Sequence, residues 1–338
     1  MASNQESAQE STSSLIVDTA QRIFSDACDH ELVEVAQEGQ WAADLWQTLE
    51  ENGLLQIGLA ESGTGLLELF EFLRVTGRHC VPLPIFERLL AQVALGREAK
   101  DVTLAEVHNG ELALAWPMQH SSVLALDARL GTARVIELAG LQQTELQTMK
   151  GEPVASFDVS SAWNDAAATE IAAPNLFALA ALGRTAQMCG GLEASLELAI
   201  SYCSEREQFG RTISKFQAIQ HQLAVLAAEV AASQRATDSA IYSVQSSMQE
   251  NAETSLRISD IAVAKVRVGA AVGVGAEIAH QVHGAMGFTM EYRLHQFTRR
   301  LWSWRDEFGT EADWAAVIGE QVCAAPADDL WGYIASHG

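Results

Sequence analysis

The hydrophobic periodicity of the chain changes twice, and the order of these changes limits the folds that the sequence can adopt. Between residues 14 and 102, apolar residues recur at the three- and four-residue spacing of amphipathic helices. Residues 103–163 instead contain short β-rich runs separated by turn residues. From about residue 174 to residue 323, almost every run shows helical spacing again, and the C-terminal domain is expected to span residues 174–338. The sequence therefore predicts a mainly α protein with a small β insert between an N-terminal helical domain and a C-terminal four-helix bundle.

The runs within each region predict individual elements. N-terminal helices are expected at residues 15–28, 41–54, 66–80 and 85–98. The second of these helices ends at Gly53, in the place of a C-cap. Strands of a small antiparallel sheet or barrel fragment are expected at residues 111–117, 122–128, 133–138 and 153–160. Further helices are expected at about residues 175–204, 214–248, 254–284, 288–302 and 311–323, and the polar residues 1–13 are expected to form a disordered tail.

The net charge of the chain is −23, which argues against two classes of partner. Nucleic acid and an anionic membrane surface both require a basic face on the protein, so neither is expected to bind. No run of 18 residues is free of charge, which argues against a membrane span. The first residues lack the basic and apolar regions of a signal peptide. The five cysteines form no C-x-x-C pair and fit reduced thiols in a cytoplasmic protein.

Two short motifs have a simpler structural explanation than a functional one. Residues 273–278 contain a lone Gly-x-Gly, but the motif follows no expected strand and lacks the third glycine of a dinucleotide-binding fingerprint. Small residues at a helix–helix contact explain it better. Glu277 and His280 form one Glu-x-x-His pair, whereas a di-iron bundle requires two such pairs and two further carboxylates. No metal site is expected.

The stretch REQFGRTISKFQ, residues 206–217, combines positive charge with a turn and a helix start. Arg206 offers a planar guanidinium that suits phosphate oxygens. Gly210 lets the backbone approach a ligand closely. The stretch therefore predicts an anion-binding site in spite of the acidic composition. A surface salt bridge of Arg206 with Glu205 or Glu207 is the alternative interpretation.

This stretch and a second one resemble the two most recognisable segments of the acyl-CoA dehydrogenase family. The first shares the pattern Arg-x-x-Phe-Gly, followed by Phe-Gln and a helix. The second is QVHGAMGFTMEYRLHQFTRRLWSWRDEFGT, residues 281–310. It is similar to a family segment that opens with Gln-x-x-Gly-Gly-x-Gly-Phe and ends in Tyr-Glu-Gly-Thr. The resemblance is strong over the C-terminal helices and loose over the N-terminal ones, and it implies the acyl-CoA dehydrogenase fold.

The resemblance implies FAD as the cofactor and places half of its binding site in this chain. In the family, the arginine of the first motif meets the FAD pyrophosphate across a subunit interface, which assigns that role to Arg206. The second motif holds the adenosine side, and Ala285 stands where the family has its second glycine. The residues carried over as cofactor-binding are Arg206, Gln208, Phe209, Phe216, Gln217, Gln281, Gly284, Ala285, Gly287 and Thr310.

The resemblance also implies a carboxylate base. The base removes the α-proton of an acyl-CoA while a hydride leaves the β-carbon for the flavin. An ungapped count from Gln281 puts Phe308 at the family's glutamate and Glu307 at the preceding tyrosine. The other family location for the base corresponds to Ala180. Both usual positions therefore lack a carboxylate, and Glu307 would serve only if the loop shifted by one residue.

The β-rich region departs from the family as well. It lacks segments similar to Thr-Glu-Pro-x-x-Gly-Ser-Asp and Lys-x-Trp-Ile-Thr, which hold the flavin ring, so a reduced β-domain is expected. Such chains resemble the smaller subunit of heteromeric bacterial acyl-CoA dehydrogenases, which are α2β2 and many of which act on CoA thioesters of steroid side chains. This resemblance implies a larger partner subunit, an acyl-CoA substrate, and an electron-transfer flavoprotein or another acceptor. The alternatives are a self-sufficient homotetramer with Glu307 as base, and a flavin-free scaffold or binding protein.

Overall fold

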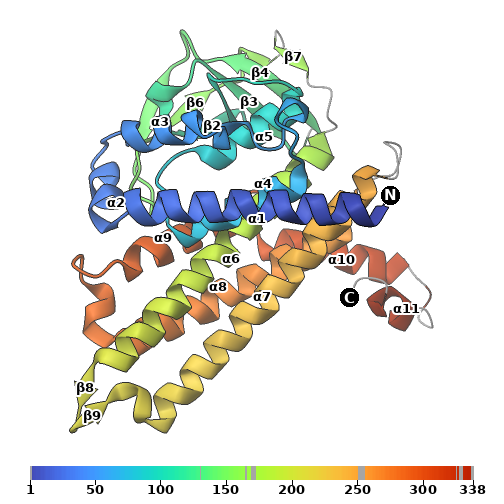
Figure 1. Ribbon diagram of the computed structural model, residues 1–338. Coiled ribbons are helices and arrows are strands. Elements are labelled where there is room, and N and C mark those ends of the chain that lie inside the picture. The colour runs from blue at the N-terminus through green and yellow to red at the C-terminus, as the bar shows by residue number, and fades with distance from the viewer. Residues whose placement is uncertain are drawn as a thin grey trace. The chain divides into compact units, whose positions relative to one another are not determined.

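The computed structural model describes residues 2–129, 131–163, 166–168, 173–249, 256–324, 326 and 330–335. The chain divides into two compact units, and Figure 1 labels the elements of both. The first unit comprises Met1–Leu73 and Val81–Gly183, and the second comprises Arg74–Cys80 and Arg184–Gly338. The predicted order of helices, sheet and helices is therefore found along the chain.

Five helices precede the sheet in the sequence. They are α1 (Ala2–Ala27), α2 (His30–Gln37), α3 (Ala43–Glu51), α4 (Leu66–Arg78) and α5 (Ile85–Leu95), with short 3-10 turns at Leu54–Gln56 and Ala60–Ser62. Four of these helices were predicted, and α2 was not. The predicted end of α3 is confirmed, because Asn52 caps the helix and Gly53 follows in the left-handed conformation with φ 71°.

The helix α1 differs from the predicted disordered tail, because it already begins at Ala2. Neither proline nor glycine occurs between Ala2 and Ala27, so nothing in this segment interrupts the helical hydrogen bonds. Ala20 and Phe24, near the other end of the helix, are fully buried. The structure thus places a helix in the segment for which a disordered tail was predicted.

Seven strands form one mixed sheet in the order β5-β6-β2-β1-β3-β4-β7. Their bounds are β1 (Val102–His108), β2 (Glu111–Ala115), β3 (Ser122–Asp127), β4 (Thr132–Glu137), β5 (Gln143–Leu146), β6 (Val154–Asp158) and β7 (Ala167–Ala168), and a 3-10 turn at Pro117–Gln119 follows β2. Strands β1 and β3 pair in parallel, with Val102 opposite Ser122, and the other neighbours are antiparallel. The predicted antiparallel pairing therefore holds for every pair except β1 and β3, and the prediction missed the parallel pair because it omitted β1.

The second unit is a bundle of helices around its own core. It contains most of α6 (Ala173–Glu205), with α7 (Gln217–Gln249), α8 (Ile258–His283), α9 (Leu294–Asp306), α10 (Glu311–Ala324) and α11 (Leu330–Ala335). A hairpin of β8 (Glu207–Gln208) and β9 (Arg211–Thr212) joins α6 to the 3-10 turn η5 (Ile213–Lys215), and a second 3-10 turn, η6 (Gly284–Phe288), follows α8. The helices α6 to α10 confirm the five that were predicted, whereas α11 was not expected.

Apolar side chains from α6, α7, α8 and α9 meet in the core of this bundle. Leu192, Leu226, Val272 and Leu301 are fully buried there, and Figure 1 shows α6, α7 and α8 as three long helices. A Cβ atom at Gly275 would lie 2.8 Å from Leu192 Cδ2, so a larger residue at that point would require the Leu192 side chain to shift. The Gly-x-Gly motif thus serves a helix–helix contact, as predicted. No helix in the described part of the chain is long and apolar enough to cross a membrane.

Candidate functional site

The hairpin between α6 and α7 has the tight turn that its sequence predicts. Phe209 and Gly210 occupy the two central positions and both have positive φ, 54° and 78°. Two consecutive left-handed residues define the type I′ turn, which matches the twist of the flanking strands. Glycine adopts this conformation without strain, but Phe209 does so at a cost. Phe209 is also 92 % exposed, so an apolar ring in a strained conformation projects from the surface of the unit.

Arg206 lies between the end of α6 and the first strand of the hairpin. Its N–H donates to the Tyr202 carbonyl at 2.9 Å, which continues the helical pattern, and its side chain is exposed. Among the described residues, no ion pair joins its guanidinium to a carboxylate, and Glu205 instead accepts a hydrogen bond from Ser201 Oγ at 2.7 Å. The described residues therefore do not contain the alternative salt bridge, and the geometry leaves Arg206 suited to an external anion.

The N-terminus of α7 follows the hairpin after the short 3-10 turn η5. The Arg211 guanidinium lies 4.2 Å from the ring centre of Phe216, and the Phe209 ring meets the same ring edge-on at 6.2 Å. Gln217 begins α7, whose first turn contains no acidic residue. The start of a long helix carries a partial positive charge and unpaired N–H groups. We call Arg206, Arg211, Phe216 and the start of α7 the arginine corner, because they combine positive charge with an aromatic ring. The side chain of Gln208 does not take part, since its Nε2 donates to the Glu207 carbonyl.

The two predicted motifs lie at neighbouring helix ends. The ring of Tyr202, on the last turn of α6, stacks on His283 at the end of α8 with a centroid separation of 4.6 Å. Tyr292 closes the group edge-on to Tyr202 at 5.9 Å. Because Arg206 follows Tyr202 by one helical turn and Gly284 follows His283 directly, the stacking joins the arginine corner to the glycine-containing turn η6.

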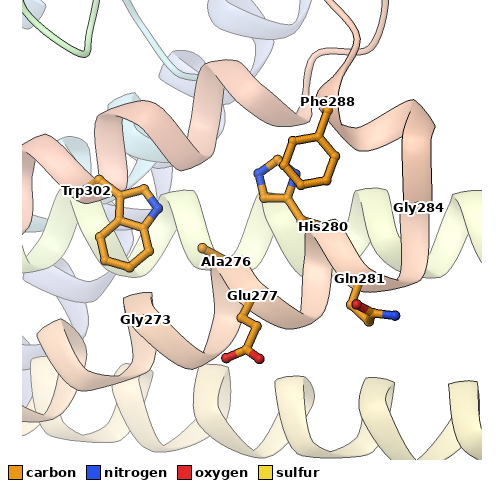
Figure 2. Close-up of a pocket in the computed structure, with 8 residues that line it drawn as sticks. All are labelled: Gly273, Ala276, Glu277, His280, Gln281, Gly284, Phe288 and Trp302. Carbon is orange, nitrogen blue, oxygen red and sulfur yellow. The ribbon is translucent and has the colours of Figure 1, made fainter.

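A pocket of about 450 Å³ lies beside α8, η6 and α9. Figure 2 shows the residues that line it, which are Gly273, Ala276, Glu277, His280, Gln281, Gly284, Phe288 and Trp302. The volume falls in the range of small-molecule sites. Gln281 and Gly284 were predicted from the sequence. Ala285 is exposed, and Gly287 is buried, where a Cβ atom would lie 3.0 Å from His283 Cβ.

Six of the eight residues that line this pocket were not predicted as site residues, and His280 and Trp302 are two of them. His280 stacks on Phe288 at 4.6 Å, and its Nε2 lies 2.9 Å from Thr298 Oγ1. Burial lowers the pKa of His280, and His283 and His295 lower it further, so the imidazole is neutral at pH 7. Trp302 comes from α9 and could be located only once α9 was known to pack on α8. The helical spacing of Gly273, Glu277 and His280 ahead of Gln281 was the signal that the sequence did offer.

The corner between α9 and α10 is held by buried charges. Arg184 Nε donates to Glu307 Oε2 at 2.6 Å, and Ser303 Oγ donates to Glu307 Oε1 at 3.3 Å. Lys265 is fully buried and donates to the carbonyls of Trp304, Arg305 and Glu307 at 2.9–3.1 Å. Burial lowers the pKa of Lys265 to about 8, although the Glu307 carboxylate opposes this shift. The carboxylate of Glu307 is therefore engaged in the structure of the corner.

Residues 169–322 match the family model of the acyl-CoA dehydrogenase C-terminal domain. Nearly half of the chain therefore matches an acyl-CoA dehydrogenase C-terminal domain. The chain is 26 % identical over 277 residues to acyl-CoA dehydrogenase IpdE2 of Mycobacterium tuberculosis, which covers 79 % of this chain and 82 % of that protein. It is 24 % identical over 297 residues to IpdE2 of Mycolicibacterium smegmatis, covering 85 % and 91 %.

Solved structures of this family confirm the fold over almost the whole chain. A variant of the Tcur3481–Tcur3483 steroid ACAD superposes with a TM-score of 0.80 at 20 % identity, covering 94 % of this chain and 99 % of that one. The ChsE4–ChsE5 complex of Mycobacterium tuberculosis gives a TM-score of 0.78 at 20 % identity, covering 93 % and 98 %. The predicted acyl-CoA dehydrogenase fold is confirmed.

The arginine corner and the pocket fit the cofactor of an acyl-CoA dehydrogenase, which is FAD. Arg206 and the start of α7 supply donors for a diphosphate. The pocket beside Gln281 has the size and the mixture of aromatic and polar groups that a nucleoside requires. Thr310 is in a different situation, because its hydroxyl donates to Asp313 Oδ2 at 2.7 Å and caps α10. The arrangement of the other residues therefore fits the phosphate and adenosine part of FAD, and Thr310 is not needed for this fit.

The positions that hold the base in the family lack a carboxylate here. Phe308 is 4 % exposed with φ 55°, and its carbonyl accepts a hydrogen bond from Trp314 Nε1 at 2.9 Å. Ala180 is fully buried on α6 and belongs to the first unit. Neither side chain can accept a proton, and Glu307 is paired with Arg184.

Proposed function

We propose that this chain is the smaller subunit of a heteromeric, FAD-dependent acyl-CoA dehydrogenase, to which it contributes the phosphate and adenosine half of the FAD site. The observation that carries this proposal is the stacking of Tyr202 on His283, which joins the arginine corner to the pocket within one unit. A diphosphate at Arg206 and a nucleoside at Gln281 would then belong to the same molecule. When bound, FAD accepts the hydride that leaves the β-carbon of the substrate.

The residues at the two positions where the family has its catalytic base imply that a partner chain supplies the base. Proton abstraction from the α-carbon requires a carboxylate within reach of that carbon. Phe308 and Ala180 cannot supply it, and the hydrogen bonds from Arg184 and Ser303 occupy the carboxylate of Glu307. We assign the base, together with the surface that holds the flavin ring, to a larger partner chain. This chain then orients the cofactor through its phosphates and adenosine.

The proposed substrate is a bulky acyl-CoA, with a steroid side chain as the acyl group. The similarity to the steroid ACAD and to IpdE2 supports this class, and the ChsE4–ChsE5 complex supports a second acyl-CoA dehydrogenase chain as the partner. An electron-transfer flavoprotein is the proposed electron acceptor. The five cysteines carry reduced thiols, four of them buried and that of Cys323 exposed, which supports a cytoplasmic location.

Expression of the chain alone and with its partner tests this proposal. The absorbance of bound flavin near its visible maximum should be present in the co-expressed complex and absent from the chain purified alone. A yellow and active preparation of the single chain would favour the homotetramer with Glu307 as base. A colourless preparation in both cases would favour a scaffold or binding protein.

A further inference from the structure

Three histidines lie together where α8 ends and α9 begins. His280 and His283 are one helical turn apart on α8, and His295 lies on the first turn of α9. His280 Nε2 is 2.9 Å from Thr298 Oγ1, and this hydroxyl is 3.5 Å from the His295 carbonyl oxygen. His283 and His295 are buried, and His280 is partly buried. The second unit thus gathers three titratable rings around the turn η6.

Two of these rings are bound to the backbone by hydrogen bonds that a neutral imidazole can make. His283 Nδ1 donates to the Ala279 carbonyl at 2.7 Å, and His295 Nδ1 donates to the Tyr292 carbonyl at 2.9 Å. A carbonyl oxygen only accepts hydrogen bonds, so Nδ1 carries the hydrogen in both rings. One face of His283 is covered by Tyr202, with a centroid separation of 4.6 Å. A second proton on either ring would therefore place a positive charge in a buried site.

The rings on α8 contact both ends of η6. His283 is the N-cap residue of this turn. His280 stacks on Phe288, the last residue of the turn, with a centroid separation of 4.6 Å and an interplanar angle of 26° (Figure 2). Gly287 lies so close to the same ring that a Cβ atom there would be 3.2 Å from His280 Nδ1. Displacement of His280 and His283 would therefore disturb η6 at both of its ends.

We propose that His280, His283 and His295 form a pH-sensitive switch, which keeps η6 packed against α8 while the rings are neutral and releases it when they gain protons. Like charges on neighbouring rings repel one another, and burial disfavours each charge. Burial lowers the pKa of His280, and His283 and His295 lower it further. Burial also lowers the pKa of His283. The unfolded chain binds these protons near about pH 6.5, so the neutral arrangement loses stability as the pH falls below that value.

No carboxylate is placed to neutralise the added charge. In the described part of the chain, no ion pair joins a carboxylate to His280 or His283. Glu277 precedes His280 by one turn of α8, but Figure 2 shows its carboxylate pointing away from the His280 ring. An aromatic face attracts a cation, yet the lowered pKa of both rings shows that burial and repulsion prevail.

The other elements packed here supply one acid. The turn η6 has no ionisable side chain. The ionisable groups at the end of α6 and around the start of α9 are Tyr202, Cys203, Glu205, Tyr292, Arg293 and Arg299. Burial and Glu205 raise the pKa of Tyr292, so this hydroxyl stays neutral. The arginines are cations and can only add to the repulsion.

Hydrogen exchange measured by mass spectrometry tests the proposal on the full chain, or on its complex with the partner if the chain does not remain in solution alone. After correction for the intrinsic pH dependence of exchange, the amides of residues 284–290 should lose protection about tenfold between about pH 7 and about pH 5. The amides of residues 226–240 in α7 should retain their protection. Equal loss in both segments would show that acid unfolds the whole unit, and unchanged protection of residues 284–290 would show no release. Either result would overturn the proposal.

A double variant separates the switch from other effects of acid. His280→Gln retains a polar group for Thr298, and His283→Phe retains a ring for Tyr202, but neither new side chain can gain a proton in this pH range. With both changes, the same fall in pH should alter the protection of residues 284–290 by less than about twofold. His221→Gln, at an exposed histidine on α7, is the matched control and should behave as the parent. An equal loss of protection in the double variant and the parent would contradict the proposal.

A proton NMR titration of the parent chain does not depend on the folding of the double variant. The C2 protons of His280 and His283, assigned through the single variants, should titrate below about pH 6.5. Titration at or above that value would also overturn the switch. Because η6 borders the pocket, its release should lower flavin content in acid, and this consequence alone rests on the proposed function. Exchange is measured without flavin, so the switch and the proposed function can fail separately.

Discussion

Arg184 donates from Nε to Glu307 Oε2 at 2.6 Å, and the side chain of this arginine is only 4 % exposed. The pair ties α6 to the corner where α9 ends and α10 begins. The same guanidinium donates from Nη1 to Gln187 Oε1 at 2.6 Å, and Gln187 Nε2 donates to Thr76 Oγ1 at 3.0 Å. Glu307 is therefore the end of a buried polar chain, which is a structural setting and not that of a poised base.

Replacement of Glu307 by glutamine should leave the chemistry of the complex nearly intact. We expect Glu307→Gln to change the steady-state rate by less than tenfold. Stability should fall by about 1–3 kcal/mol, because Arg184 loses the charge that compensates its burial. Rate measurements and thermal unfolding of the complex check both parts, and Asp306→Asn at the exposed neighbouring position is the control. A loss of rate of a few thousandfold, the scale of a general base, would instead identify Glu307 as catalytic.

Removal of Arg206 should weaken cofactor binding. A charge-assisted contact with phosphate contributes about 2–3 kcal/mol when it is largely shielded from water. Arg206→Ala should therefore lower the flavin content of the purified complex, measured by absorbance after denaturation. Arg235→Ala removes another exposed arginine, from α7, and should leave the flavin content unchanged. Equal flavin content in the two variants would contradict the assignment of Arg206.

The helical part of this fold could be predicted because local patterns determine it. The spacing of apolar residues located α6 to α10, and the Gln-Phe-Gly sequence located the turn between α6 and α7. Strand β1 was missed because most of its residues are buried, so the alternation that marks a half-exposed strand is absent. Strand β5 was missed for the opposite reason, since all four of its residues are exposed.

The candidate site was predictable only where its residues form a motif in sequence. Arg206 and Gln281 belong to such motifs, and both could be named without a structure. Trp302 lies 21 positions beyond Gln281 and reaches the same pocket because α9 packs against α8. The pairing of Arg184 with Glu307 joins residues 123 positions apart. Contacts of this kind depend on tertiary packing, which local periodicity does not contain.

Acid should destabilise the second unit through His79. Burial, together with the charges of Arg78 and Arg293, lowers the pKa of His79 to about 4. The unfolded chain binds a proton at this histidine near pH 6.5, whereas the folded chain does not until about pH 4. The contribution of His79 to stability is therefore complete above pH 6.5 and is lost as the pH falls toward 4. The free energy of unfolding of the His79→Gln variant, measured with denaturant, should fall less steeply over this pH window than that of the parent. The His221→Gln variant, altered at an exposed histidine, should show the same pH dependence as the parent.

The assembled enzyme should be an α2β2 tetramer with two FAD molecules. This chain carries the residues that suit phosphates and adenosine, in Arg206, Gln217, Gln281 and Gly284. It carries no carboxylate at Phe308 or Ala180 and lacks the sequence segments that hold a flavin ring. A homotetramer of this chain would therefore contain four surfaces that bind the phosphates and adenosine of FAD. It would contain no surface that binds the flavin ring, so none of its FAD sites would be complete.

Pairing with a full-length partner gives one complete site in each heterodimer, and two heterodimers give two flavins. Native mass spectrometry reports the subunit composition, and the ratio of flavin to protein absorbance reports the number of sites. The exposed Phe209 and Phe288 should become protected from oxidative footprinting in the complex, because a cofactor and a partner chain would cover them. The exposed Trp331 on α11 serves as an internal reference for the footprinting. Four flavins per tetramer would show that this chain also binds the flavin ring. The proposal that each FAD site is shared between two different chains would then be wrong.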